Sequence, residues 1–216
     1  MGAGSSPRAG SSDGSLPGDP REALIDAALR LFARQGYDAT TAAQIAAEAG
    51  IPEADFATYF ATPESVLMSI VDDISHATAA ALAGIDRGRD PERALLDAGS
   101  VMVTGIVEGR GPIPIERLLA MARIVSSTRN LHRKVSAARK RVIAQPLADW
   151  MGVDPDDRRL RRALTMWSAV TASAYVSAAD LTDEYEPRGD SNLRHRMIAN
   201  IAQSFGEVMG ENPKAP

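Results

Sequence analysis

Side chains that commonly carry catalysis or bind metal ions are sparse and scattered in this sequence. Cysteine is absent, so disulfides, thiolate chemistry and cysteine-based metal sites are excluded. The three histidines, His76, His132 and His195, have no metal-ligand companions at suitable spacing. No nucleophile motif, phosphate-binding glycine loop or paired acidic metal site is present. We therefore expect neither an enzyme nor a metal site, and no cofactor.

The sequence pattern that remains with a functional interpretation is a pair of short helices around a glycine turn, for which the candidate function is recognition of nucleic acid. Thr41 and Gln44 are spaced as a capping box, which satisfies the free N–H groups at a helix start. The helix that they open is predicted to run through Ala47, Ala49-Gly50-Ile51 is predicted to form a tight turn, and another short helix follows over residues 52–59. With a helix in front, this pair has the geometry of a helix-turn-helix. Bundles that never touch DNA share this spacing, so both interpretations stay open.

Two longer helices must hold this pair in place. The first is predicted from Asp19 and Pro20, a cap followed by a residue suited to the first helical position, and it ends near Gly36. The second is predicted to begin at Thr62-Pro63-Glu64 and to run to about Leu82. Together these elements define a unit over residues 19–71.

The rest of the chain keeps helical patterning, and no stretch alternates at period two. The sequence is therefore predicted to be all-α, with a helical bundle over residues 72–216 and a charged loop at 182–191. Further helices are predicted near residues 91–107, 115–127, 131–151, 156–179 and 192–209.

Composition limits where the protein works. Residues 1–18 are rich in Gly, Ser and Pro without an apolar core, so we expect a disordered tail rather than a signal peptide. No apolar run approaches the ~18 residues of a membrane helix, which predicts a soluble, cytoplasmic protein without a membrane partner. The formal net charge of -4 argues mildly against nucleic acid as a partner.

A collinear pattern runs through the predicted helix-turn-helix: ALRLFARQGYDATT at 28–41, then Gln44-Ile45-Ala46, Ala49-Gly50-Ile51 and Tyr59-Phe60. This ungapped pattern resembles the N-terminal signature of the TetR family of transcriptional regulators. The resemblance implies an N-terminal three-helix DNA-binding domain followed by a ligand-binding and dimerisation domain. A homodimeric repressor on a palindromic double-stranded DNA operator, released by a small apolar effector, is the function that it implies.

Carried onto this sequence, the resemblance assigns the DNA contacts. Thr40 and Thr41 are expected to place a hydroxyl and backbone N–H groups against a phosphate, with Gln44 supporting them. Residues 52–58 are expected to form the recognition helix, with Tyr59 near the DNA backbone. The expected DNA-binding residues are Thr40, Thr41, Gln44, Pro52, Glu53, Ala54, Asp55, Thr58 and Tyr59.

The recognition segment departs from the family in its charge. Residues 20–70 hold three basic and seven acidic side chains, and Pro63 stands where the family usually has lysine. Glu53 and Asp55 either complement the helix dipole, worth ~0.3 to 1 kcal/mol, or accept hydrogen bonds from cytosine. Few basic residues predict weak non-specific binding and a shallow salt dependence. The alternative is a helical dimer that binds a ligand or protein without DNA.

The C-terminal helices offer Met and aromatic side chains mixed with hydroxyls, which suit an apolar pocket, although an apolar stripe on a helix is more often core packing than a ligand site. Two basic runs, 133–141 and 158–162, are expected to form solvated helix faces. The expected ligand-binding residues are Met102, Ile106, Met121, Val125, Trp167, Val170 and Tyr175. The expected dimer interface consists of Leu164, Ala172, Met197, Ile201 and Phe205.

Overall fold

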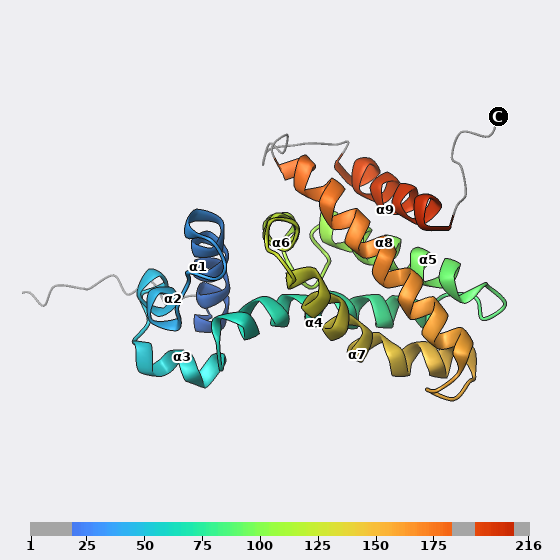
Figure 1. The fold of residues 1–216 in the computed structure, drawn as a ribbon, viewed down its shortest axis with the longest axis horizontal. Coiled ribbons are helices and arrows are strands. Elements are labelled where there is room, and N and C mark those ends of the chain that lie inside the picture. The colour runs from blue at the N-terminus through green and yellow to red at the C-terminus, as the bar shows by residue number, and fades with distance from the viewer. Residues whose placement is uncertain (1–18, 183–192, 210–216) are drawn as a thin grey trace, which may run out of the picture.

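Helices make up all the regular structure of residues 19–182 and 193–209, which are the residues that the computed structural model describes (Figure 1). The all-α prediction is confirmed for these residues. The expected tail at 1–18 and nearly all of the charged loop at 182–191 lie outside them. The elements are α1 (Pro20–Gln35), α2 (Ala42–Ala49), α3 (Glu53–Tyr59), α4 (Pro63–Leu82), α5 (Pro91–Val107), α6 (Ile115–Ser127), α7 (Leu131–Met151), α8 (Arg158–Thr182) and α9 (Leu193–Met209).

The predicted caps form, with one difference in detail. Thr41 accepts from the Gln44 backbone N–H, and the Gln44 side chain accepts in return from the Thr41 N–H at 3.0 Å. Gly50 ends α2 in the left-handed region, with φ of 69°, where a side chain would be strained. At the start of α4 a second capping box forms between Thr62 and Ser65, and Pro52 occupies the N-cap position of α3 instead of lying inside the helix.

One apolar cluster joins the first three helices to the rest of the chain. It starts with Leu24 in α1, passes through Ile45 and Ile70, and continues to Met121 in α6 and Tyr175 in α8. The predicted unit boundary after residue 71 therefore falls inside the continuous helix α4. Figure 1 shows α4 running from the group of α1, α2 and α3 into the larger bundle.

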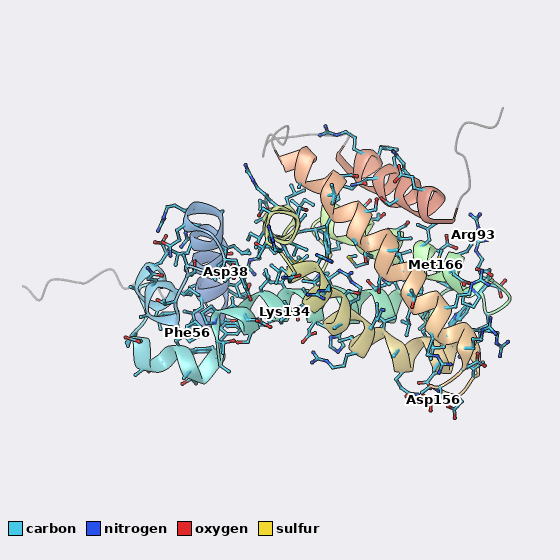
Figure 2. All side chains as sticks on the ribbon, viewed as in Figure 1. Asp38, Phe56, Arg93, Lys134, Asp156 and Met166 are labelled. Carbon is cyan, nitrogen blue, oxygen red and sulfur yellow. The ribbon has the colours of Figure 1, made fainter. Side chains whose placement is uncertain are left out.

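A second apolar cluster lies at the other end of the molecule, between α5, α7 and α8. Trp150 belongs to it and donates from its indole to the backbone oxygen of Ile85 at 3.1 Å. Figure 2 shows Phe56 of α3 at one end of the long axis and Asp156 at the opposite end. The two ends are held together mainly by α4 and α7, which also exchange ion pairs, among them Arg141 with Asp72 at 3.2 Å.

Among the described residues, no helix combines the length and the apolar character that crossing a membrane requires.

We predict that Ile70→Ala, which truncates a side chain with 0% exposure in the shared cluster, lowers the free energy of unfolding by about 2–5 kcal/mol. Urea denaturation at fixed protein concentration measures the change, and Val101→Ala, at a position that is 55% exposed, is the control expected to stay within ~0.5 kcal/mol. Far-UV and tryptophan signals should move together. Two separated transitions would show that the first helices unfold independently.

Candidate functional site

The short helix α3 presents an accessible face at one end of the molecule. Pro52, Glu53, Ala54, Asp55 and Thr58 are exposed, and Tyr59 is 40% exposed. The same helix is anchored from behind by two buried rings, Phe56 and Phe60, whose centroids lie 6.1 Å apart. All six residues expected along this segment are therefore accessible.

The three polar residues expected at the start of α2 differ in their exposure to solvent. Thr41 and Gln44 are exposed and form the capping box. Thr40 differs from the expectation, since it is only 7% exposed and donates its hydroxyl to the backbone oxygen of Gly36 at 2.8 Å. Its hydroxyl fixes the turn between α1 and α2 and is not presented to a phosphate.

The few basic side chains of residues 20–70 are already engaged. Arg30 and Arg34 both reach Glu48, each at 3.1 Å, and their hydrogen bonds hold the pKa of that carboxyl below its usual value. Arg21 contacts Glu22 and Asp73 and lies 5.7 Å from the centre of the Phe60 ring. The accessible face of α3 carries two carboxylates and no cation of its own.

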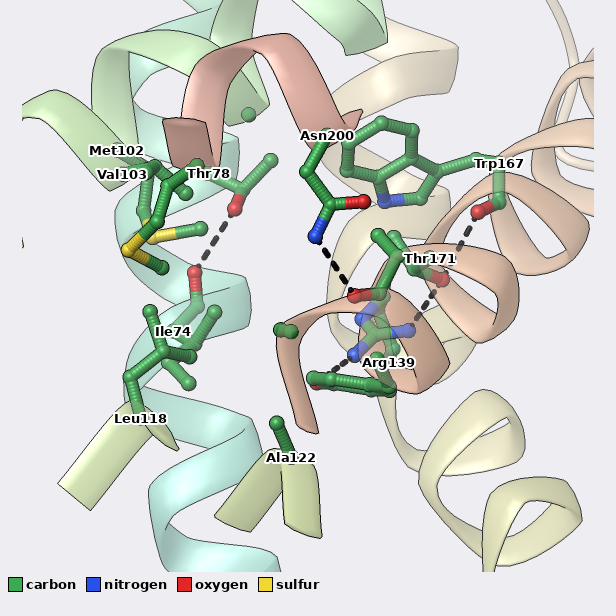
Figure 3. A pocket seen from close by; sticks show the side chains of 15 residues that line it. Ile74, Thr78, Met102, Val103, Leu118, Ala122, Arg139, Trp167, Thr171 and Asn200 are labelled. Atoms are coloured by element: carbon green, nitrogen blue, oxygen red, sulfur yellow. Dashed lines mark hydrogen bonds between the residues drawn. The ribbon is translucent and has the colours of Figure 1, made fainter. Parts of the chain in front are cut away.

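An apolar cavity lined by described residues lies in the bundle, between α4, α5, α6, α7, α8 and α9 (Figure 3). It measures about 590 Å³ including the part open to solvent. The lining is Ile74, Thr78, Gly99, Met102, Val103, Leu118, Ala122, Arg139, Trp167, Thr171, Ala174, Tyr175, Ala178, Met197 and Asn200. This is the kind of space in which small ligands bind.

A buried arginine supplies the charge of the cavity. Arg139 of α7 is 5% exposed and donates to Thr171 Oγ1 at 2.6 Å and to the Tyr175 hydroxyl. Asn200 of α9 donates to the backbone oxygen of Ala174 at 3.2 Å. With Thr78 of α4, the polar groups of the cavity thus come from four different helices.

An indole closes one side of the cavity over a glycine. A Cβ atom on Gly99 would lie 2.4 Å from the ring of Trp167, so only glycine leaves room for the ring at this point of α5. The Trp167 Nε1 is buried and has no hydrogen-bond partner among the described residues.

Some of the predicted ligand-binding residues line the cavity and others do not. Met102, Trp167 and Tyr175 line it. The other four, Ile106, Met121, Val125 and Val170, are buried in the apolar clusters and do not line it.

The residues expected at a dimer interface are also divided. Met197 is 4% exposed and faces the cavity within its own chain, and Leu164 is buried in the second apolar cluster. Ala172 is half-buried on α8. The side chains of Ile201 and Phe205 lie outside the described part of the chain.

Sequence reasoning placed Arg139 on a solvated face, and this expectation is wrong. Its exposed neighbours Arg133 and Arg141 fit the expectation, but Arg139 is the middle member of a stripe with a spacing of four residues whose other members are apolar. A charged residue at the centre of such a stripe was the signal that could have identified it. The stripe consists of Leu131, Val135, Arg139, Ile143 and Leu147.

A second nearly buried arginine joins the cavity wall to the first helices. Arg117 of α6 precedes the cavity residue Leu118 and donates to Asp26 of α1 at 2.7 Å. It also donates to the carboxylate of Glu22. The hydrogen bonds to these carboxylates raise the pKa of Arg117, so the guanidinium stays charged. The contact ties α6 to α1.

Comparison with known proteins agrees with this arrangement. Residues 24–68 match the family described as bacterial regulatory proteins of the tetR family. The HTH-type transcriptional regulator TcmR of Streptomyces glaucescens is 31% identical over 184 residues, covering 83% of this chain and 78% of that protein. This identity and coverage exceed what a shared helix-turn-helix alone would give.

Two solved structures show the same fold at lower identity. A TetR-family regulator from Syntrophomonas wolfei has a TM-score of 0.56 at 12% identity, covering 91% of this chain and 98% of that one. The fatty acid degradation regulator FadR of Bacillus halodurans has a TM-score of 0.52 at 16% identity, covering 91% and 97%.

We predict that Gly99→Ala displaces the Trp167 ring, shifts tryptophan fluorescence and lowers the free energy of unfolding by about 1–3 kcal/mol, because the added methyl overlaps the indole. Gly84→Ala, where a Cβ would meet only a backbone oxygen at 3.6 Å, is the control. Phenylalanine is too short to reach the added methyl. The cost should therefore shrink in a Trp167→Phe background, and an equal cost in both backgrounds would place the strain elsewhere.

Proposed function

The chain belongs to the TetR family of bacterial regulatory proteins, and from this premise we propose that it represses transcription as a homodimer on a palindromic operator. A small, largely apolar effector entering the cavity would release the DNA. The observation that carries the proposal is the exposed face of α3, which follows the capped α2 and the Gly50 turn in the order of a helix-turn-helix.

The DNA contacts follow from the exposed groups. The first N–H groups of α2 have no partner within the helix and suit a phosphate oxygen, with the Thr41 hydroxyl beside them. Thr58 and Tyr59 add two exposed hydroxyls, while Glu53 and Asp55 are suited to accept from cytosine N4. A two-fold dimer would place two copies of α3 in successive major grooves, about 34 Å apart.

The dimer contact is assigned to α8 and α9 by analogy with the family. Val176 supports α8 as one face, because it is a large apolar side chain that is 59% exposed. Ala172 lies one turn earlier and leaves room for close approach of a second helix.

Effector release would act through α6. Leu118 and Ala122 of α6 line the cavity, so a ligand that enters would press on this helix. A shift of α6 would carry Arg117 with it and change the position of α1 through Asp26 and Glu22. Release then requires that the effector binds the shifted arrangement more tightly.

A ligand-binding dimer without DNA binding is the second candidate. It is favoured by the engagement of Arg30 and Arg34 with Glu48 and by the carboxylates on α3. Both features reduce attraction to phosphate.

Selection of bound sequences from a random DNA pool, at low and at moderate salt, decides between the two candidates. We expect a palindrome to be enriched, with a shallow salt dependence because few phosphates are neutralised. Thr58→Ala should weaken binding to that palindrome about tenfold, as loss of a direct contact does, whereas Ser127→Ala, at the exposed end of α6, should not. No enrichment at either salt concentration would reject the repressor and leave the second candidate.

We further predict that Arg117→Met uncouples the cavity from DNA. The variant should still bind effector with unchanged affinity, because Arg117 does not line the cavity, but effector should release DNA at least about tenfold less effectively. Titration of effector against DNA-bound protein measures this release. Arg123→Met, which changes an exposed arginine of the same helix, is the control, and normal release by Arg117→Met would contradict this route.

A further inference from the structure

We infer that the cavity takes an organic anion, a largely apolar molecule whose single acidic group, a carboxylate or an acidic hydroxyl, lies against Arg139. The inference rests on the proposed function, since it assigns a ligand class to the cavity through which that function is regulated. It changes the expected effector from a purely apolar molecule to an amphipathic one.

The contacts of Arg139 are all with neutral groups. Its guanidinium donates to the hydroxyls of Thr171 and Tyr175, and its central carbon lies 5.2 Å from the centre of the Tyr175 ring. No ion pair among the described residues includes Arg139, and none of the residues that line the cavity is acidic. The other nearly buried arginine, Arg117, has two carboxylate partners.

A buried cation without an anion is unfavourable. Hydroxyls and a ring face offset part of the lost hydration, but charged side chains inside proteins normally face an opposite charge. A guanidinium has five N–H groups, of which the contacts above occupy two. A ligand carboxylate can accept two parallel hydrogen bonds from such a group. The cavity therefore lacks the partner that Arg139 requires, and a ligand can supply it.

A second buried donor points to the same ligand chemistry. The unpartnered Nε1 of Trp167 needs an acceptor. Figure 3 shows Trp167, Thr171, Arg139 and Asn200 on one side of the cavity. On the other side lie Ile74, Met102, Val103 and Leu118, which offer apolar surface. This division fits a molecule with an acidic end and an apolar body.

Arg139 also accounts for which ligands the cavity rejects. A neutral apolar molecule would bury the guanidinium more deeply without pairing it, and a cationic one would add repulsion at short range. Thr78, on the opposite wall, offers an anion no free hydroxyl donor, because its hydroxyl already donates to the backbone oxygen of Ile74 at 2.9 Å.

Matched acid and amide probes test the inference on the full chain. The first pair is naphthoate and naphthamide, and the second is decanoate and decanamide, which separate a flat aromatic body from an aliphatic one. Calorimetric titration at neutral pH should show, in at least one pair, the acid binding roughly ten- to hundredfold more tightly than its amide, the range for a hydrogen bond to a buried charge. The pair with the larger preference for the acid over the amide shows whether the cavity favours a flat aromatic or an aliphatic ligand.

Substitutions then locate the preference. Arg139→Met should reduce the ratio of acid to amide affinity to about one while leaving amide binding, and Arg139→Lys should keep part of the preference because it keeps the charge. Arg133→Met, an exposed arginine on the same helix, should leave the ratio unchanged. The lysine variant and the wild-type comparison still decide the matter if the methionine variant fails to fold.

Three outcomes would overturn the inference. Equal binding of acid and amide by the wild type would reject the anion while leaving an effector cavity in place. An acid preference that survives in Arg139→Met would place the anion elsewhere. No binding of any of the four probes at millimolar concentration would reject apolar anions as ligands. DNA selection reports on the proposed function separately, because it requires no ligand.

Discussion

Burial of one apolar cluster joins the DNA-facing helices to the rest of this chain, and most other features depend on it. Leu24 and Ile45 hold α1 and α2 together, Ile70 places α4 beneath them, and Met121 and Tyr175 continue the same cluster into the bundle. Because interiors are close-packed, a displacement at one end of such a cluster is transmitted rather than absorbed. The protein thus has a physical connection between the cavity wall and α3 without a separate hinge.

Two nearly buried arginines have opposite surroundings, and the contrast explains their different roles. Arg117 is neutralised by Asp26 and Glu22 across the contact between α6 and α1, so it is a structural connection. Among the described residues, Arg139 contacts only hydroxyls and a ring, which is the basis for the anion that we propose as its partner. Two buried arginines can therefore differ in whether they are ion-paired, because this depends on the side chains of the neighbouring helices and not on the residue type.

The acidic recognition face fits a protein whose DNA contacts rely on shape and hydrogen bonds. Glu48 occupies Arg30 and Arg34, which keeps α1 and α2 together at the expense of phosphate attraction. When the non-specific affinity for DNA is weak, discrimination among DNA sequences depends on the groups that α3 presents to base edges. A protein that has no DNA target would also show this acidic face. The charge pattern is therefore compatible with both the repressor and the ligand-binding dimer without DNA binding.

The sequence by itself determined the helices and the helix-turn-helix, because caps, glycine stops and apolar spacing act between residues close in the chain. The starts at Asp19 and Thr41 and the turn at Gly50 were all predicted for this reason. Tertiary structure decided which side chains share a space. Thr40 and Arg139 are polar residues that look exposed along the chain, yet both are buried, and the partners of Arg139 lie on α8, more than 30 residues away. Ile106, Met121, Val125 and Val170 look like pocket residues, but the packing of their helices turns them into the core. Apolar periodicity predicts that a helix face is buried. Only the arrangement of the neighbouring helices decides whether that face packs in the core or lines a cavity.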